Sequence, residues 1–172
     1  MRTLAMTPEY VLDVFQVDCG AKQRQIDWVA HVLDGNAKMA EAGNPDLASR
    51  EPFDLPKTGA WKWLREARSF KPGGPIKMEW QDGEVRLRLR MLEPGTERVI
   101  VCGYPSTDQP NSPSVPMVMV RKKAKQAVFA AVWLIGSEIE DVTLKSLPAH
   151  DGKLVYQVKA GEVTRKHVIP GL

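Results

Sequence analysis

Residues 76–91, IKMEWQDGEVRLRLRM, decide the fold of this chain. Apolar and polar residues alternate on both sides of Asp82-Gly83, and this period of two is typical of a β-strand with one buried face. An Asp-Gly pair between two such runs is the strongest short-range signal of a β-hairpin, because a type I′ turn needs positive φ at both central residues. We therefore predict two antiparallel strands joined by a turn at Asp82-Gly83.

The same alternation recurs along the chain. It predicts further strands at 10–17, 23–33, 98–104, 117–122, 127–135, 142–147, 154–159 and 163–169. The segment 10–17 is apolar on both faces, which is typical of a strand inside its sheet, and the turn at Cys19-Gly20 predicts that it pairs with 23–33 as a hairpin. Roughly ten strands with almost no helical periodicity predict an all-β fold, an antiparallel two-layer β-sandwich forming a single domain over residues 1–172.

One segment interrupts this pattern. Residues 34–60 are rich in Gly, Pro, Asn, Asp and Ala, so we expect one long loop there, with a short helical turn near 37–42. A loop of this length within a compact domain is uncommon and is usually functional or mobile.

Composition places the chain among ordinary globular proteins, with 43% hydrophobic and 26% charged residues. A net charge of +3 does not call for a nucleic acid or a membrane surface as partner, and no apolar stretch is long enough to span a bilayer. Cys19 and Cys102 are far apart in sequence, and we interpret them as buried free thiols, although a fold that brought them together would allow a disulfide.

The first residues lack the apolar core of a secretory signal. Either the protein stays inside the cell, or this chain is the downstream part of a longer one. We favour the longer chain, because a strong strand follows Thr7-Pro8-Glu9 at once. The protein would then be periplasmic or secreted if the parent chain carries a signal, and cytoplasmic otherwise.

No complete catalytic set can be identified in the sequence. None of the histidines has a second histidine or a cysteine at metal-ligand spacing, and there is no Gly-rich phosphate loop or nucleophile elbow. We therefore predict no catalytic residue, no metal and no cofactor.

Arg86, Arg88 and Arg90 alternate with apolar residues, so their guanidinium groups should point off one face of the sheet about 7 Å apart. That spacing is comparable to the charge repeat of an acidic polymer, and arginine binds carboxylate and sulfate in bidentate fashion. The alternative is an outer sheet face that is merely solvated or paired with acidic residues of the next strand.

Trp61 and Trp63 are expected to share one strand face, where they would stack on sugar rings or fill the core. His31 ends an apolar strand and would either contact substrate or bond to a neighbouring strand. The run 121–125, RKKAK, is a basic turn that would act as a solvated tip or as a polyanion site.

Several stretches together resemble the downstream portion of heparinase II/III-like polysaccharide lyases. Residues 10–17, YVLDVFQV, are similar to that family's Asp-Val-Phe-Arg-Val strand, and 25–31, QIDWVAH, to its next strand, which closes on histidine. The family's order continues in WKWL at 61–64, VRLRL at 85–89, PGTE at 94–97, VMVRK at 118–122 and AVFAAV at 127–132.

The resemblance implies a C-terminal β-sandwich that packs against an α/α toroid in an enzyme cleaving uronic-acid polysaccharides by β-elimination. In that reaction a base removes the proton next to the uronate carboxyl group and a neutralising group stabilises the resulting enolate. The family's catalytic Tyr, His and Asn, and its metal-binding His and Asp, lie in the toroid and in the first strands of the sandwich. This sequence begins after them, so no catalytic residue is carried over.

Three functions follow as hypotheses. The first is a lyase sandwich that acts as scaffold or substrate support and is inactive alone. The second is a stand-alone acidic-glycan binding module that uses Arg86, Arg88 and Arg90 with Trp61 and Trp63. The third is a complete small enzyme with an unrecognised site. An exposed apolar patch at the N-terminal edge would favour the first hypothesis, because the toroid would dock there.

Overall fold

The computed structural model describes all residues except 32–37, 42–49, 106–111, 137 and 141. The elements in chain order are β1 (Arg2–Met6), β2 (Val11–Asp18), β3 (Arg24–His31), β4 (Lys38–Glu41), β5 (Glu51–Pro52), the 3₁₀ helix η2 (Gly59–Trp63), β6 (Arg65–Phe70), β7 (Ile76–Asp82), β8 (Val85–Met91), β9 (Thr96–Pro105), β10 (Ser114–Ala124), β11 (Gln126–Ile135), β12 (Val142–His150), β13 (Lys153–Ala160) and β14 (Val163–Pro170).

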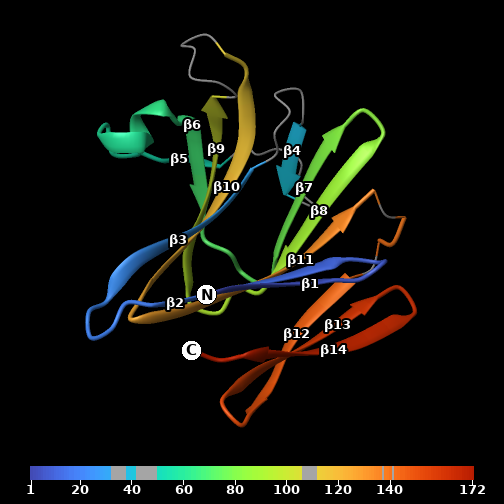
Figure 1. The fold of residues 1–172 in the computed structure, drawn as a ribbon. Helices are drawn as coiled ribbons and strands as arrows, with labels where there is room; N and C mark the ends of the chain where they lie inside the picture. Colours follow the sequence, from blue (N-terminus) through green and yellow to red (C-terminus); the bar gives the residue numbers. More distant parts are fainter. Residues whose placement is uncertain (32–37, 42–49, 106–111, 137, 141) are drawn as a thin grey trace.

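These strands form three antiparallel sheets. The six-stranded sheet has the order β1-β2-β11-β8-β7-β4, the five-stranded sheet β3-β10-β9-β6-β5, and the three-stranded sheet β12-β13-β14. The two large sheets face each other, and the three-stranded sheet covers the other face of the six-stranded one (Figure 1). The predicted all-β antiparallel sandwich is confirmed, and the small sheet adds a further layer to it.

The main core fills the space between the two large sheets. Alternate residues of the strands point into it, as the period of two requires. Trp28 of the five-stranded sheet lies 5.9 Å from Trp133 of the six-stranded sheet, and Trp133 lies 5.7 Å from Trp80, measured between ring centroids. These three rings therefore connect the two sheets.

A second core lies between the six-stranded and three-stranded sheets. Leu12 and Val14 of β2 point into it, whereas Phe15 and Val17 of the same strand pack against the main core. The segment 10–17 is apolar on both faces because its sheet is covered on both sides. The Tyr10 hydroxyl lies 2.7 Å from His167 Nε2 and ties β14 to the start of β2.

The hairpin β7–β8 is present, but its turn lies one residue later than predicted. Asp82 pairs with Val85, so the central turn residues are Gly83 and Glu84. Gly83 has φ 55°, whereas Glu84 is not among the described residues with positive φ. A positive φ at the first central residue, without one at the second, fits a type II′ turn. The twist of this turn also matches the twist of the strands.

The predicted hairpin between 10–17 and 23–33 is wrong. β2 pairs with β1 and β11, whereas β3 pairs with β10 in the other sheet. The chain instead crosses from one sheet to the other at Cys19-Gly20. Phe15 of β2 and Ile26 of β3 both pack in the main core, so the two strands face each other instead of pairing edge to edge.

The expected long loop at 34–60 is only partly a loop. Residues 38–41 form β4, so the helical turn expected near 37–42 is wrong in its described part, and residues 37 and 42 lie outside the described residues. β5 and η2 also begin within this segment. The strand β1 was not predicted, because its alternate residues Leu4 and Met6 are exposed at a sheet edge.

Lys122 of β10 is buried beside the main core, with only 6% of its surface exposed. Its Nζ donates a 2.6 Å hydrogen bond to the carbonyl of Val128 and lies 4.8 Å from the ring centroid of Phe129. Burial lowers the pKa of Lys122 to about 8, although the charge of Glu93 acts in the opposite direction.

This lysine predicts a pH-dependent stability difference. Because its folded-state pKa lies below its unfolded value, the cost of burying the charge is fully present below pH 8 and is relieved as the pH rises towards the unfolded value near 10.5. Lys122→Met should therefore be more stable than the wild type at pH 7, by on the order of 2 kcal/mol. Urea unfolding at pH 7 and pH 10 should show this gap closing, and a gap independent of pH would contradict the assignment.

Candidate functional site

The three predicted arginines share one face of β8, as their alternation requires, but they do not form an exposed ridge. Arg88 is only 3% exposed, and β12 of the three-stranded sheet contacts β8. Arg86 Nε lies 3.4 Å from the carboxylate of Glu79, and Arg90 donates a 3.1 Å hydrogen bond to the carbonyl of Leu89. Burial, followed by the charge of Arg88, lowers the pKa of Arg90. This face is therefore a poor platform for a long acidic chain.

The two predicted tryptophans lie in η2, not in a strand. Residues two positions apart in a 3₁₀ helix point in different directions, so Trp61 and Trp63 do not share a face. Trp61 is half-buried against the outer cluster, which lies on the five-stranded sheet away from the main core and consists of Ile100, Cys102, Met117 and Met119. Trp63 is 48% exposed, and Lys62 Nζ lies 4.7 Å from the centroid of its ring.

His31 ends β3 on the same outer face as the outer cluster. It pairs in register with Met117, and its ring stacks on that of Tyr104 with centroids 5.7 Å apart and an interplanar angle of 22°. Both side chains are exposed. The stack lies at the end of the five-stranded sheet where β3 and β9 finish and β10 begins, which we call the cavity end.

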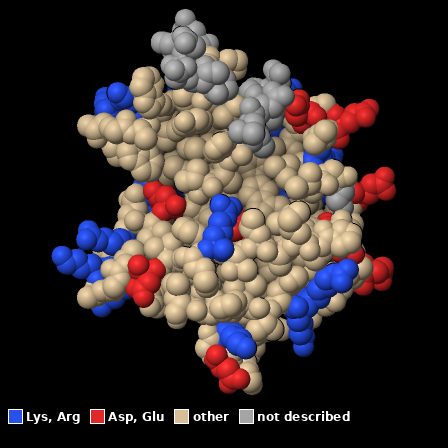
Figure 2. Space-filling model, in the orientation of Figure 1, with Lys and Arg blue, Asp and Glu red and all other residues tan. Residues whose placement is uncertain are grey.

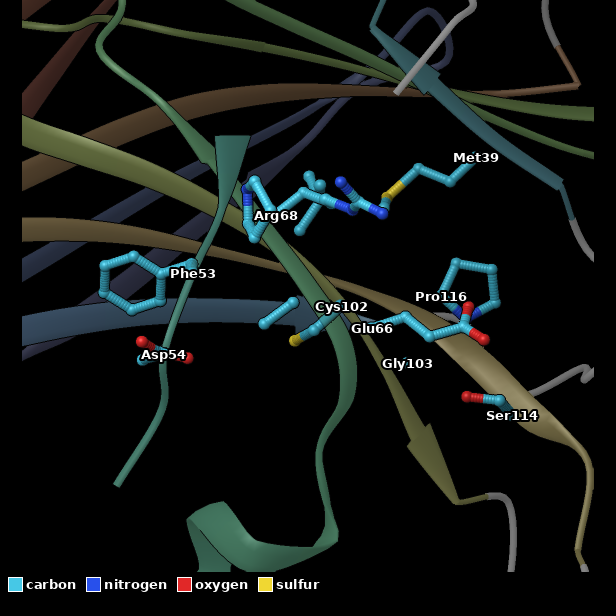
Figure 3. Close-up of a pocket in the computed structure, with 12 residues that line it drawn as sticks. Met39, Phe53, Asp54, Glu66, Arg68, Cys102, Gly103, Ser114 and Pro116 are labelled. Atoms are coloured by element: carbon cyan, nitrogen blue, oxygen red, sulfur yellow. The ribbon is translucent and has the colours of Figure 1, made fainter. Parts of the chain in front are cut away.

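A cavity of about 680 Å³ opens at this end, lined by residues of β4, β5, β6, β9, β10 and the segment after β5. Its polar side chains include Asp54, Glu66, Arg68 and Ser114. Figure 3 shows Phe53 and Asp54 on one side of β6, and Glu66 and Pro116 on the other. The guanidinium group of Arg68 extends towards Met39 of the opposite sheet (Figure 3). The cavity thus offers anionic, cationic and aromatic groups together.

Glu66 lies at a β-bulge. Arg65 pairs with Gly103 and Arg68 with Val101, so Glu66 and Ala67 together oppose Cys102 alone. Glu66 has φ 53°, a left-handed conformation that is unfavourable for a residue with a Cβ and is usually taken by glycine in this type of bulge. A strained residue that projects a carboxylate into a cavity is a candidate for a functional one.

Gly103 leaves room for the Ser114 side chain at the cavity. A Cβ added at Gly103 would lie 1.9 Å from Ser114 Oγ, so the serine side chain keeps its position because residue 103 is glycine.

Cys102 and Cys19 are free thiols, as predicted, with Cys19 only partly buried. Burial raises the pKa of the Cys102 thiol to about 12, so at neutral pH it is not the thiolate that a nucleophile requires.

The groups at this site are suited to binding a sugar chain. Within the part of the chain that the structure describes, no group of three or more His, Cys, Asp or Glu could hold a metal ion. Carboxylates accept hydrogen bonds from sugar hydroxyls, a guanidinium binds a carboxylate, and aromatic rings stack on the apolar face of a sugar ring. The cavity end combines all three kinds of group.

Of the residues singled out in the sequence, His31 lies at this end of the sheet, and the sequence did not point to the residues that line the cavity. Asp54, Glu66, Arg68 and Ser114 lie in segments without a recognisable motif, and the pairing of β5 with β6, β6 with β9 and β9 with β10 gathers them. Tyr104 lies near the end of the apolar strand β9 and carries no signal of its own.

No protein-family model matches this chain, and no curated protein matches it. In the described residues, no helix is long and apolar enough to cross a membrane.

Glu66→Gly is expected to stabilise the protein by about 1 kcal/mol, because glycine adopts the left-handed conformation without strain. Glu66→Ala keeps the Cβ and should give no such gain. Urea denaturation of the two variants and the wild type measures this difference. Loss of stability in the glycine variant would show that the Glu66 side chain supports the fold.

Proposed function

We propose that this chain is the C-terminal β-sandwich of a heparinase II/III-like polysaccharide lyase. In this proposal the sandwich acts as a scaffold or supports the substrate, and it carries no catalytic residues. The proposal rests on the resemblance of its strand sequences to that family and on its sandwich fold. The observation that carries the substrate-supporting role is the cavity end, where the His31–Tyr104 stack lies at the same end of the sheet as a cavity with two carboxylates and a guanidinium group.

In this proposal a sugar ring of the polysaccharide stacks on the exposed rings at the cavity end. Glu66 and Asp54 accept hydrogen bonds from its hydroxyl groups, and Arg68 pairs with a uronate carboxylate. The residues that hold the glycan are thus different from the Arg86, Arg88 and Arg90 set considered first.

The N-terminal edge supports a scaffold role. β1 is an edge strand of the six-stranded sheet, and its side chains Leu4 and Met6 are 56% and 80% exposed. An exposed apolar strand edge is a typical surface for packing against another domain. In the parent enzyme this edge would contact the α/α toroid.

The first test is turnover by the chain alone. Elimination produces a 4,5-unsaturated uronate, whose ultraviolet absorbance can be followed with alginate, heparin or polygalacturonate as substrate. We expect no product above background with any of them. Appreciable turnover would contradict the proposal and favour a complete small enzyme.

The second test is binding of uronate oligosaccharides, measured by calorimetry. Tyr104→Ala is expected to weaken binding about tenfold by removing a stacking ring, whereas Tyr104→Phe keeps the ring and should bind like the wild type. Equal affinities of all three proteins would contradict a glycan site at the cavity end.

A stand-alone acidic-glycan binding module is the second candidate function. It is favoured by the cavity being lined by residues of this chain, so that binding needs no partner domain. Full affinity in the isolated chain, unchanged by adding a lyase toroid, would favour this second candidate.

A further inference from the structure

Two loops lie side by side at the opposite end of the five-stranded sheet, where β3 begins and β10 finishes. One loop joins β2 to β3 and the other joins β10 to β11, and both cross between the two large sheets. The amide of Cys19 donates a 2.7 Å hydrogen bond to the carbonyl of Lys125, and Gln23 Nε2 a 3.0 Å bond to the carbonyl of Lys123. These bonds hold the two loops together in what we call the arch end.

The arch end gathers four exposed cations from the two loops and the strand ends beside them: Lys22, Arg24, Lys123 and Lys125. Arg24 pairs in register with Ala124 and Lys123 with Gln25, so the Arg24 and Lys123 side chains point off opposite faces of the same sheet end. Figure 2 shows Lys and Arg side chains gathered at the left of the molecule, where the β2–β3 loop lies in Figure 1.

Among the described residues, these four cations are not held by carboxylates, as several basic residues of the same sheets are. Arg2, Arg121 and Arg165 each make an ion pair with a carboxylate at 3.0 Å or less. Within the described part of the chain, none of the four arch-end cations makes an ion pair, and the neighbouring Asp18 accepts hydrogen bonds from the Gly20 amide and the Gln126 side chain.

Asp18 adds one negative charge beside these four cations. The hydrogen bond from the Gly20 amide lowers the pKa of Asp18, so this carboxylate stays charged.

The structure shows which side chains of the run RKKAK at 121–125 are held or buried and which face solvent. Arg121 is held by Asp27 through two hydrogen bonds of 2.8 and 3.0 Å, and Lys122 is buried. Only Lys123 and Lys125 face solvent from this loop, which alone would be a solvated tip. Lys22 and Arg24, on the neighbouring segment that is hydrogen-bonded to this loop, bring the number of exposed cations to four.

We propose that the arch end is a second binding site, which takes the carboxylate or sulfate groups of an acidic polysaccharide. The choice of an acidic polysaccharide as ligand rests on the proposed function. The location of the arch end is independent of the cavity. β10 runs from the cavity end at Ser114 to the arch end at Ala124, about 33 Å apart in an extended strand. A long acidic glycan could thus contact both ends of one sheet.

The experiment compares four-residue glutamine variants by calorimetry and by retention on immobilised heparin across a salt gradient. The arch variant replaces Lys22, Arg24, Lys123 and Lys125. The control variant replaces four exposed lysines of the three-stranded sheet, Lys145, Lys153, Lys159 and Lys166, and so removes the same charge. We expect the arch variant to lose about tenfold or more in affinity for heparin or polygalacturonate at low salt, and the control to lose much less.

Equal losses in the two variants would overturn the proposal, because binding would then follow net charge alone. Tighter binding of the wild type to duplex DNA than to the polysaccharides would also overturn it. If Tyr104→Ala abolishes binding and the arch variant binds normally, the arch site fails and the proposed function stands. If the arch variant loses affinity while Tyr104→Ala does not, the arch site stands and the cavity assignment fails. No binding by the wild type would refute both.

Discussion

Replacing Trp80 with alanine is expected to lower the free energy of unfolding by about 4 kcal/mol. Trp80 is 2% exposed and lies in the main core, 5.7 Å from Trp133, which in turn packs against Trp28 of the other sheet. The substitution leaves a cavity where the two large sheets meet, and strands on both sides can collapse only partly to fill it. Urea unfolding followed by far-ultraviolet circular dichroism measures the loss without relying on tryptophan fluorescence.

Trp63→Ala is the matched control for this prediction. It removes the same side chain from a position that is 48% exposed, so its effect on stability should stay within about 0.5 kcal/mol. Similar destabilisation by the two substitutions would show that the three tryptophans do not connect the sheets as described.

Arg2→Ala is expected to destabilise the protein by about 2 kcal/mol. The carboxylate of Asp13 is fully buried, and Arg2 donates to its two oxygens at 2.9 and 2.6 Å. Removing the arginine leaves a buried negative charge without its partner. The effect should be smaller than for a fully buried pair, because the Arg2 side chain is 53% exposed.

A double-mutant cycle tests this explanation. Asp13→Ala in the Arg2→Ala background should restore part of the lost stability, because the uncompensated charge is gone. If the double variant is less stable than Arg2→Ala by the full cost of the single Asp13→Ala change, the two residues are not coupled.

Most of the strands could be predicted from the sequence, because the alternation of apolar and polar residues is a local property, but β1, β4, β5 and β6 were not predicted. Which strands pair could not be predicted. The segments 10–17 and 23–33 have the pattern of a hairpin, and the same pattern fits two strands that face each other across a core. Similarly, the alternation at 86–90 places the arginines on one face correctly but cannot reveal that β12 contacts that strand.

Candidate site residues were named from the sequence only where a side chain is conspicuous by itself. His31 ends an apolar strand and lies at the cavity end, where it stacks on Tyr104. Glu66 could not be predicted, because its role depends on a bulge that exists only when β6 pairs with β9. The Trp61–Trp63 pairing failed because a shared face requires a strand, and the segment forms a 3₁₀ helix.

The pairing of β2 with β11 has a consequence for how this protein folds during synthesis. Phe15 lies opposite Phe129 in the six-stranded sheet, and Asp27 lies opposite Arg121 in the five-stranded sheet. β2 can pair early with its neighbour β1, but its other edge has no partner until β11 has been synthesised, and β3 has none until β10 has. Contacts so distant in sequence slow folding, since a long loop must close before these pairings form. Until then the apolar edges of β2 and β3 are open to other chains, so we expect expression yield to depend on chaperones more than native stability alone would suggest.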